Sequence, residues 1–261
     1  MRALVLSLAL ATFAVAIPAA SAAPQDNPEV VDKRPEVQAL LDKLAGHVKE
    51  RGTQDTEAVA VIDQLLQEFP KSGPKDRDAI VKGLDKCFEV KREQNEEGVF
   101  DNRLYLACAV SLREMAPESA AILMKWIGHK SHRKDVDLQQ KLIQSLGKTR
   151  DEKGRQLLIK TLDDKTPAIQ AATAEALGEF GAAEEKIRKE NFEELLKVLM
   201  SVKGLVDADV NDTISRERYD TISAPIISSL SRLSGQKIHD PNEWQRWWNK
   251  NKNEAWAPVS G

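Results

Sequence analysis

The sequence predicts an all-α protein built as a solenoid, that is, a stack of antiparallel helix pairs. Charged residues make up 30% of the chain and aromatic residues 5%, and no segment shows the polar–apolar alternation of a half-buried strand. Between residues 169 and 180, six apolar or small side chains lie at the spacing of one helix face. Patterns of the same kind recur at intervals of 31 to 35 residues, which is typical of helical repeats.

The recurrence is present in both helices of a repeat unit. Residues 104–115 repeat the apolar face of residues 169–180 at an offset of 65, and residues 138–146 repeat part of it at an offset of 31. The preceding helix recurs as well, because residues 122–127 align with residues 157–162. A single helix pair cannot bury such faces alone, so each unit needs neighbours of the same kind.

The N-terminus predicts export from the cytoplasm. Arg2 precedes an apolar run over residues 3–20, and Ala20-Ser21-Ala22 forms a small-x-small cleavage pattern. Residues 1–22 are therefore predicted to be a secretory signal peptide cut after Ala22, the alternative being a retained membrane anchor. No later stretch approaches the roughly 20 apolar residues that cross a bilayer, so no transmembrane segment is expected after cleavage. The predicted location is the periplasm or the extracellular space.

The first half of the mature chain predicts four helices. Residues 23–34 are polar and contain proline, and we expect a flexible leader there. Pro35 suits the first turn of a helix, and the proline- and glycine-bearing residues 70–74 form a strong break. A charged loop over residues 91–102 precedes the fourth helix. The predicted helices cover residues 35–48, a stretch after Gly52-Thr53 that carries apolar residues from 59 to 69, residues 74–92 and residues 102–115.

The second half predicts short paired helices followed by two longer ones. Thr166 and Pro167 can cap and open the helix that carries the face of residues 169–180. Pro225 falls inside the last long helix, where it predicts a kink or a split. The predicted apolar segments are residues 122–127, 138–146, 157–162 and 169–180, and the two longer helices cover residues 184–206 and 213–234.

Residues 157–178 carry a family resemblance. They combine an apolar helix, an Asp-Asp-x-x-Pro turn and the pattern Ile-x-x-Ala-x-x-x-Ala-Leu-Gly. This unit resembles a HEAT-like repeat, and the resemblance is strongest over residues 117–182. It implies a right-handed HEAT/armadillo-like superhelix whose second helices line the concave face and which binds other macromolecules. Some enzymes that attach or isomerise bilin pigments also carry such repeats, but nothing outside the repeats of this chain points to that chemistry.

The end of the chain predicts a capping helix over residues 240–253. Asp240 can cap it, Pro241 can take its first position and Glu243 completes a capping box. This tail resembles one found at the end of exported bacterial HEAT-like proteins. Three tryptophans share one face of the helix, so the candidate partner-binding residues are Trp244, Arg246, Trp247 and Trp248, with Trp256 beside them. The alternative is that this face is buried against the preceding helix.

The two cysteines, Cys87 and Cys108, lie on the third and fourth predicted helices. In an antiparallel hairpin with its loop near Gly98 they fall at nearly the same height. A disulfide between them is therefore geometrically possible in an oxidising compartment. The alternative is a pair of small buried thiols in the hairpin core.

One turn gathers side chains that can bind a divalent metal. His129, His132, Asp135 and Asp137 lie close together in the sequence. Three basic residues interleave with them and would repel a cation, and the spacing matches no known ligand motif. A solvated loop is the alternative. Outside this turn, no nucleophile motif, phosphate loop or His-Glu-x-x-His pattern is present.

These observations favour an interaction protein over an enzyme. Without Arg2 the mature chain carries 37 Lys and Arg against 41 Asp and Glu, so the basic field that nucleic acid requires is missing. We predict a non-enzymatic exported scaffold with a protein or peptide partner and no cofactor. The alternatives are a metal- or small-ligand-binding protein or an enzyme that uses the turn from His129 to Asp137, and a structural protein that associates with its own copies.

Overall fold

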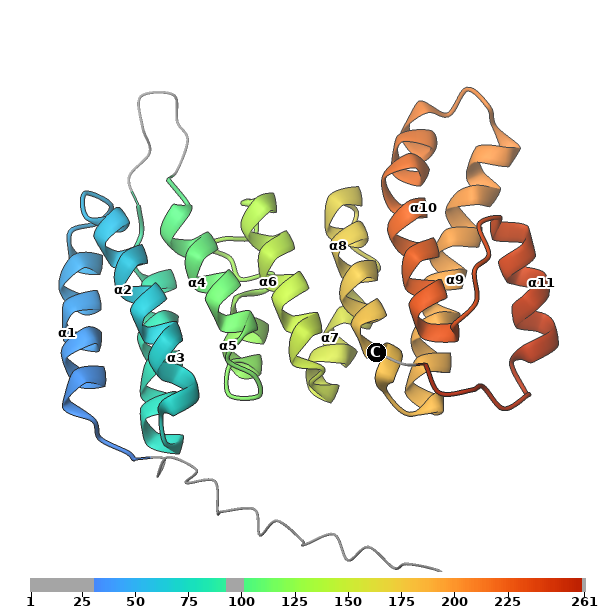
Figure 1. The fold of residues 1–261 in the computed structure, drawn as a ribbon. Coiled ribbons are helices and arrows are strands. Elements are labelled where there is room, and N and C mark those ends of the chain that lie inside the picture. The colour runs from blue at the N-terminus through green and yellow to red at the C-terminus, as the bar shows by residue number, and fades with distance from the viewer. Residues whose placement is uncertain (1–30, 93–100, 260–261) are drawn as a thin grey trace, which may run out of the picture.

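The computed structural model of the chain describes residues 31–92 and 101–259, and these residues are helical with no β-strand (Figure 1). Val31 and Ser72 form one isolated bridge. The α-helices are α1 (Pro35–Lys49), α2 (Asp55–Glu68), α3 (Pro74–Glu89), α4 (Arg103–Arg113), α5 (Ala120–Trp126), α6 (Val136–Thr149), α7 (Glu152–Thr161), α8 (Pro167–Gly178), α9 (Glu185–Ala208), α10 (Thr213–Ser234) and α11 (Pro241–Asn251), with short 3-10 turns η1 (Phe69–Lys71) and η2 (Glu179–Ala182).

The helices form five consecutive pairs and a terminal helix, arranged in two layers. Helices α2, α4, α6, α8 and α10 each pack on the next member of the series, and we call these the second helices. Helices α1, α3, α5 and α7 follow one another in the other layer, and α11 packs on α9. Figure 1 shows the pairs succeeding one another from α1 to α10. This arrangement confirms the predicted all-α solenoid of antiparallel helix pairs.

Polar side chains and prolines define where the helices begin. The carboxylates of Asp135, Asp151, Asp212 and Asp240 each accept a hydrogen bond from a backbone N–H in the first turn of the helix that follows. Proline opens α1, α3, α8 and α11, where its missing N–H costs no helical hydrogen bond. The observed starts at Pro35, Pro74, Pro167 and Pro241 agree with the sequence, but the predicted capping by Thr166 is wrong, because its side chain makes no hydrogen bond to the first turn of α8.

Residues 31–34 belong to the folded domain, although the sequence placed them in the flexible leader. Asp32 Oδ1 accepts hydrogen bonds from the backbone N–H groups of Lys75 (2.9 Å) and Asp76 (3.2 Å) at the start of α3. The Asp76 carboxylate in turn accepts from the N–H groups of Lys33 and Arg34. This reciprocal capping joins segments more than 40 residues apart, so no local sequence pattern reveals it. The predicted signal peptide, residues 1–22, lies outside the described residues.

Two further predictions, on Pro225 and on membrane-spanning segments, can be compared with the structure. Helix α10 continues through Pro225, so the predicted split does not occur; the helix packs on both α8 and α9, and this tertiary contact supports it. Within the described residues, no helix is both long enough and apolar enough to cross a membrane.

Candidate functional site

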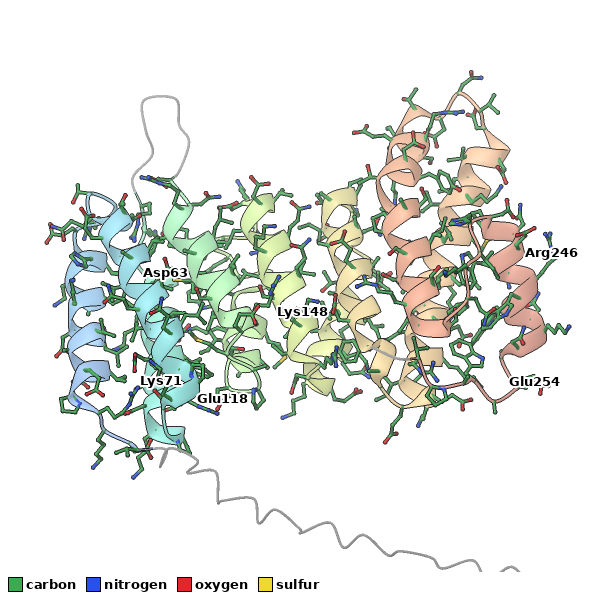
Figure 2. The ribbon with its side chains drawn as sticks, viewed as in Figure 1. Asp63, Lys71, Glu118, Lys148, Arg246 and Glu254 are labelled. Atoms are coloured by element: carbon green, nitrogen blue, oxygen red, sulfur yellow. The ribbon has the colours of Figure 1, made fainter. Side chains whose placement is uncertain are left out.

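The layer of second helices is hollowed above α8. The hollow is a cleft of about 250 Å³ whose lining comes from α4, α6, α8 and the first residue of η2. Figure 2 shows Lys148, one of the lining residues, near the middle of this layer. The lining residues are Arg113, Gln144, Lys148, Glu175, Ala176 and Glu179.

The cleft forms because α8 approaches its neighbours closely. Eight of the twelve residues of α8 are buried, and many of them are alanine. A Cβ atom at Gly147 of α6 would lie 2.6 Å from the Cα of Ala176, and one at Gly178 would lie 2.5 Å from the Ser229 hydroxyl of α10. Since real Cβ atoms do not come so close, only glycine at these positions lets the helices pack at this distance. Arg113 of α4 and Gln144 and Lys148 of α6 line the cleft beside the residues of α8.

Polar contacts fix the walls of the cleft. Gln144 donates to the Glu175 carboxylate at 2.8 Å, and Lys148 donates to the Glu179 carboxylate at 2.7 Å. Arg232 of α10 donates to the other oxygen of Glu179 at 2.9 Å and to the backbone oxygen of Glu175 at 3.2 Å. These contacts tie α6, α8 and α10 together, so the groups that face the cleft are held in place before any partner arrives.

Neighbouring cations hold the Glu179 carboxyl group in its charged form. Burial alone would raise the pKa of its carboxyl group, but the hydrogen bond and charge of Lys148 and the charge of Arg232 outweigh it, so the net pKa lies below the ordinary value. The six lining residues include two cations, Arg113 and Lys148, and two carboxylates, and none of the six is Ser, Cys, Thr or His. Such a lining can hydrogen-bond and pair with a polar chain segment.

The sequence pointed to none of these cleft residues, because each resembles an ordinary solvated charge. One signal could have found them. Gln144–Glu175 and Lys148–Glu179 are both separated by 31 residues, which is the repeat offset already visible in the apolar faces. Equivalent positions in consecutive repeats lie side by side, so complementary polar residues at that offset indicate a ladder across the second helices.

The turn from His129 to Asp137 is held by structural contacts. His132 is buried, its Nε2 lies 2.8 Å from the Phe88 carbonyl oxygen, and its ring packs among Phe88, Tyr105 and Trp126. Asp135 caps α6 through Leu138 N–H and accepts hydrogen bonds from Asn102. Within the described part of the chain, no three His, Cys, Asp or Glu side chains are gathered as a metal site requires. His129 also packs edge-on against the ring of Trp126, 4.6 Å away between centroids.

The tryptophan face of α11 points inward. The rings of Trp244, Trp247, Trp248 and Trp256 all lie between 5.1 and 5.5 Å, centroid to centroid, from that of Phe192 on α9. Trp244 is fully buried, which corrects its assignment as a partner-binding residue: it closes the end of the core. Trp247 and Trp248 are half-buried, and only Arg246 of the predicted set is well exposed.

Both cysteines are free and fully buried in the structure. Cys87 Sγ donates to the Gly83 carbonyl oxygen of its own helix at 3.6 Å. Burial raises the pKa of the Cys108 thiol well above its usual range, and the adjacent Cys87 side chain raises it further. The two side chains thus lie together in the α3–α4 core, where the sequence placed them, and a disulfide between them stays a prediction.

Residues 130–199 match a family model described as HEAT repeats. This segment, 70 of the 261 residues, is similar to HEAT repeats. It includes α6, α7 and α8 and reaches into α9, so it holds five of the six residues that line the cleft. Comparison with curated proteins and with solved structures gives no match.

Proposed function

We propose that this protein is an exported, non-enzymatic scaffold whose second-helix layer binds another protein or a peptide, with the cleft above α8 as the centre of the binding face. The observation that carries the proposal is the cleft lined by α4, α6, α8 and the start of η2, whose charged groups are held by Gln144–Glu175, Lys148–Glu179 and Arg232. HEAT repeats form helical scaffolds that are often used in protein interaction, and the predicted signal peptide supports export.

The chemistry of the cleft favours a polypeptide as the partner. Two cations and two carboxylates line the cleft together, which suits a chain that presents both charges and backbone amides. The half-exposed apolar stripe of α4, formed by Leu106, Ala107 and Val110, lies on the same helix as Arg113 and extends the face. An apolar patch beside fixed charges is the usual composition of a protein interface.

The test is affinity capture of the mature chain, residues 23–261, from an envelope extract of its source, followed by mass spectrometry. Arg113→Glu reverses a charge that faces the cleft. Among the described residues, the only ion pair of Arg113 is with the neighbouring, exposed Glu114. Lys82→Glu, on the exposed surface of α3, is the matched control. We expect a stoichiometric partner that Arg113→Glu loses and Lys82→Glu keeps. Failure to capture any partner at low or high salt would overturn the proposal.

A further inference from the structure

The α9–α10 hairpin ends in an exposed apolar tip. Helices α9 and α10 have 24 and 22 residues, whereas the other described α-helices have 7 to 16. At a rise of 1.5 Å per residue, α9 is about 12 Å longer than the longest of the others. Figure 1 shows the hairpin rising past the neighbouring pair ends. Its tip therefore lies beyond the contacts that the solenoid itself makes.

Large apolar side chains gather at this tip. Leu205 is 49% exposed, Val210 is 69% exposed and Ile214 is 79% exposed, and these are three of the six exposed large apolar residues in the described chain. The remaining three lie on separate segments. Single exposed apolar residues are ordinary on protein surfaces, but three within ten positions at the end of one projecting helical hairpin concentrate apolar surface there, as interaction sites do.

The tip is ordered by its own hydrogen bonds. Asp209 Oδ1 accepts from the Asn211 N–H at 2.8 Å, and Asp212 accepts from Ile214 N–H and Ser215 N–H to cap α10. Arg216 donates to the carbonyl oxygen of Val210 at 2.8 Å. The loop thus presents Val210 and Ile214 in a fixed arrangement, so docking would cost little conformational entropy.

The charge around the tip identifies the chemistry of its partner. Asp207, Asp209 and Asp212 lie within the segment from Gly204 to Ser215. Lys203 pairs with Asp207 and Arg216 donates to the Val210 carbonyl oxygen, so among the described residues Asp209 and Asp212 are the carboxylates of the tip that have no cation paired with them. Hydrogen bonds from Ser215 and from backbone N–H groups lower the pKa of Asp212, so it stays charged at neutral pH. Carboxylates beside apolar side chains complement an apolar socket rimmed with Lys or Arg. Anionic lipid would be repelled by Asp209 and Asp212.

We propose that the α9–α10 tip is a second docking surface, which inserts Val210 and Ile214 into an apolar, basic-rimmed socket on another protein. This inference rests on the proposed interaction function but not on the cleft above α8. Five of the six cleft residues lie within the matched segment 130–199, while the tip, over residues 205–214, lies beyond it. The protein would then hold its partner, or a second partner, at two separate places.

The test uses a photo-crosslinking amino acid at Asn211 in the chain of residues 23–261, exposed to the same envelope extract. A matched chain carries it at Lys82 on α3, whose side chain is 66% exposed and lies outside both proposed surfaces. We expect a crosslinked protein from position 211 and not from position 82. The crosslinked peptide should come from an apolar surface that has Lys or Arg beside it.

Variants measure the contribution of the tip. The double change Val210→Ser with Ile214→Ser should weaken binding of the crosslinked protein roughly tenfold or more, since central apolar anchors dominate interfaces. Asp209→Lys should also weaken it and reduce its salt dependence. Val31→Ser, at an exposed apolar residue outside both the tip and the layer of second helices, is the control and should leave binding unchanged.

The outcomes separate this inference from the proposed function. If a captured partner binds the Val210/Ile214 variant as tightly as the unaltered chain, the tip is not a docking surface. The proposed scaffold function would be unaffected by that result. If no partner is captured, both proposals fail. A crosslink from position 211 to another copy of this chain, or co-sedimentation of the chain with phosphatidylserine vesicles that is lost in the same variant, would also overturn the tip as a socket-docking surface.

Discussion

At the scale of single residues, Asp55 and Arg92 form a buried, bidentate ion pair. The two hydrogen bonds are 2.8 and 2.9 Å long, and the side chains are 0% and 1% exposed. Arg92 also donates to the carbonyl oxygen of Val90 and lies 5.4 Å from the centroid of the Tyr105 ring. The pair joins the start of α2 to the segment that follows α3. Because Asp55 and Arg92 are 37 positions apart, the sequence did not indicate the pair.

Arg92→Leu should destabilise the protein by about 3–5 kcal/mol, because it leaves the Asp55 carboxylate buried without its counter-charge. The free energy of unfolding from urea denaturation measures this loss. Asp78→Ala removes an exposed ion pair with Lys82 on α3 and should cost less than about 0.5 kcal/mol. Equal losses in the two variants would show that burial does not control the strength of these pairs.

Glu179 predicts a dependence of stability on pH. Its pKa in the folded chain lies below the ordinary value of 4.5, owing to Lys148 and Arg232, which outweigh the opposing effect of burial. A carboxyl group with a lowered pKa contributes stability that is complete above its unfolded pKa and is lost as pH falls through the folded pKa. Glu179→Gln should therefore cost about 1 kcal/mol at pH 7, and the difference from the unaltered chain should shrink below about pH 4.5. A difference that stays constant down to pH 2 would contradict this linkage.

At the scale of elements, close contacts between helices determine the packing. Substitutions at two helical glycines test this. Gly147→Ala should destabilise the protein by about 1–3 kcal/mol, because its Cβ would lie 2.6 Å from the backbone of Ala176. Gly204→Ala in α9 is the matched control, since no atom lies within 4 Å of its Cβ. That change should stabilise the protein by about 0.5–1 kcal/mol, because alanine lowers the entropy of the unfolded chain. Thermal or urea unfolding of the two variants should show opposite signs.

The α3–α4 hairpin predicts the reactivity of the cysteines. Cys87 and Cys108 are fully buried, and burial raises the pKa of the Cys108 thiol, so neither thiolate is available in the folded chain. A colorimetric disulfide reagent should label neither residue under native conditions and both in guanidinium. Rapid labelling of the native protein would contradict the buried arrangement. Two thiols that stay unlabelled in guanidinium until a reductant is added would reveal the disulfide.

Elements were more predictable from the sequence than the contacts between them. Apolar spacing located the α8 helix and its repeats, and Asp240 with Pro241 marked the start of α11. The capping of residues 33 and 34 by Asp76 was missed because it spans more than 40 positions. The burial of Trp244 against Phe192 was one of two open alternatives, since spacing along a helix shows which residues share a face but not what covers that face.

The whole molecule is a stack in which each pair contacts its neighbours. The repeat period of the sequence predicted this stacking, whereas the cleft depends on how closely three helices approach one another. That distance is set by Gly147, Gly178 and the small residues of α8, whose effect appears only when consecutive repeats are placed side by side. The fold was therefore readable from periodicity, and the cleft needed the structure.

A stack with contacts only between neighbours should respond locally to damage at either end. Phe192→Ala removes the ring at the centre of the tryptophan cluster and should cost about 3–5 kcal/mol. Hydrogen exchange followed by mass spectrometry should then show lost protection in α9 and α11, with α1 to α4 unchanged. Arg92→Leu should give the reverse pattern, because its contacts lie among α2, α3 and α4. Uniform loss of protection along the described helices in both variants would mean that the protein unfolds as one cooperative unit, in which case binding at the tip and at the cleft would be energetically coupled.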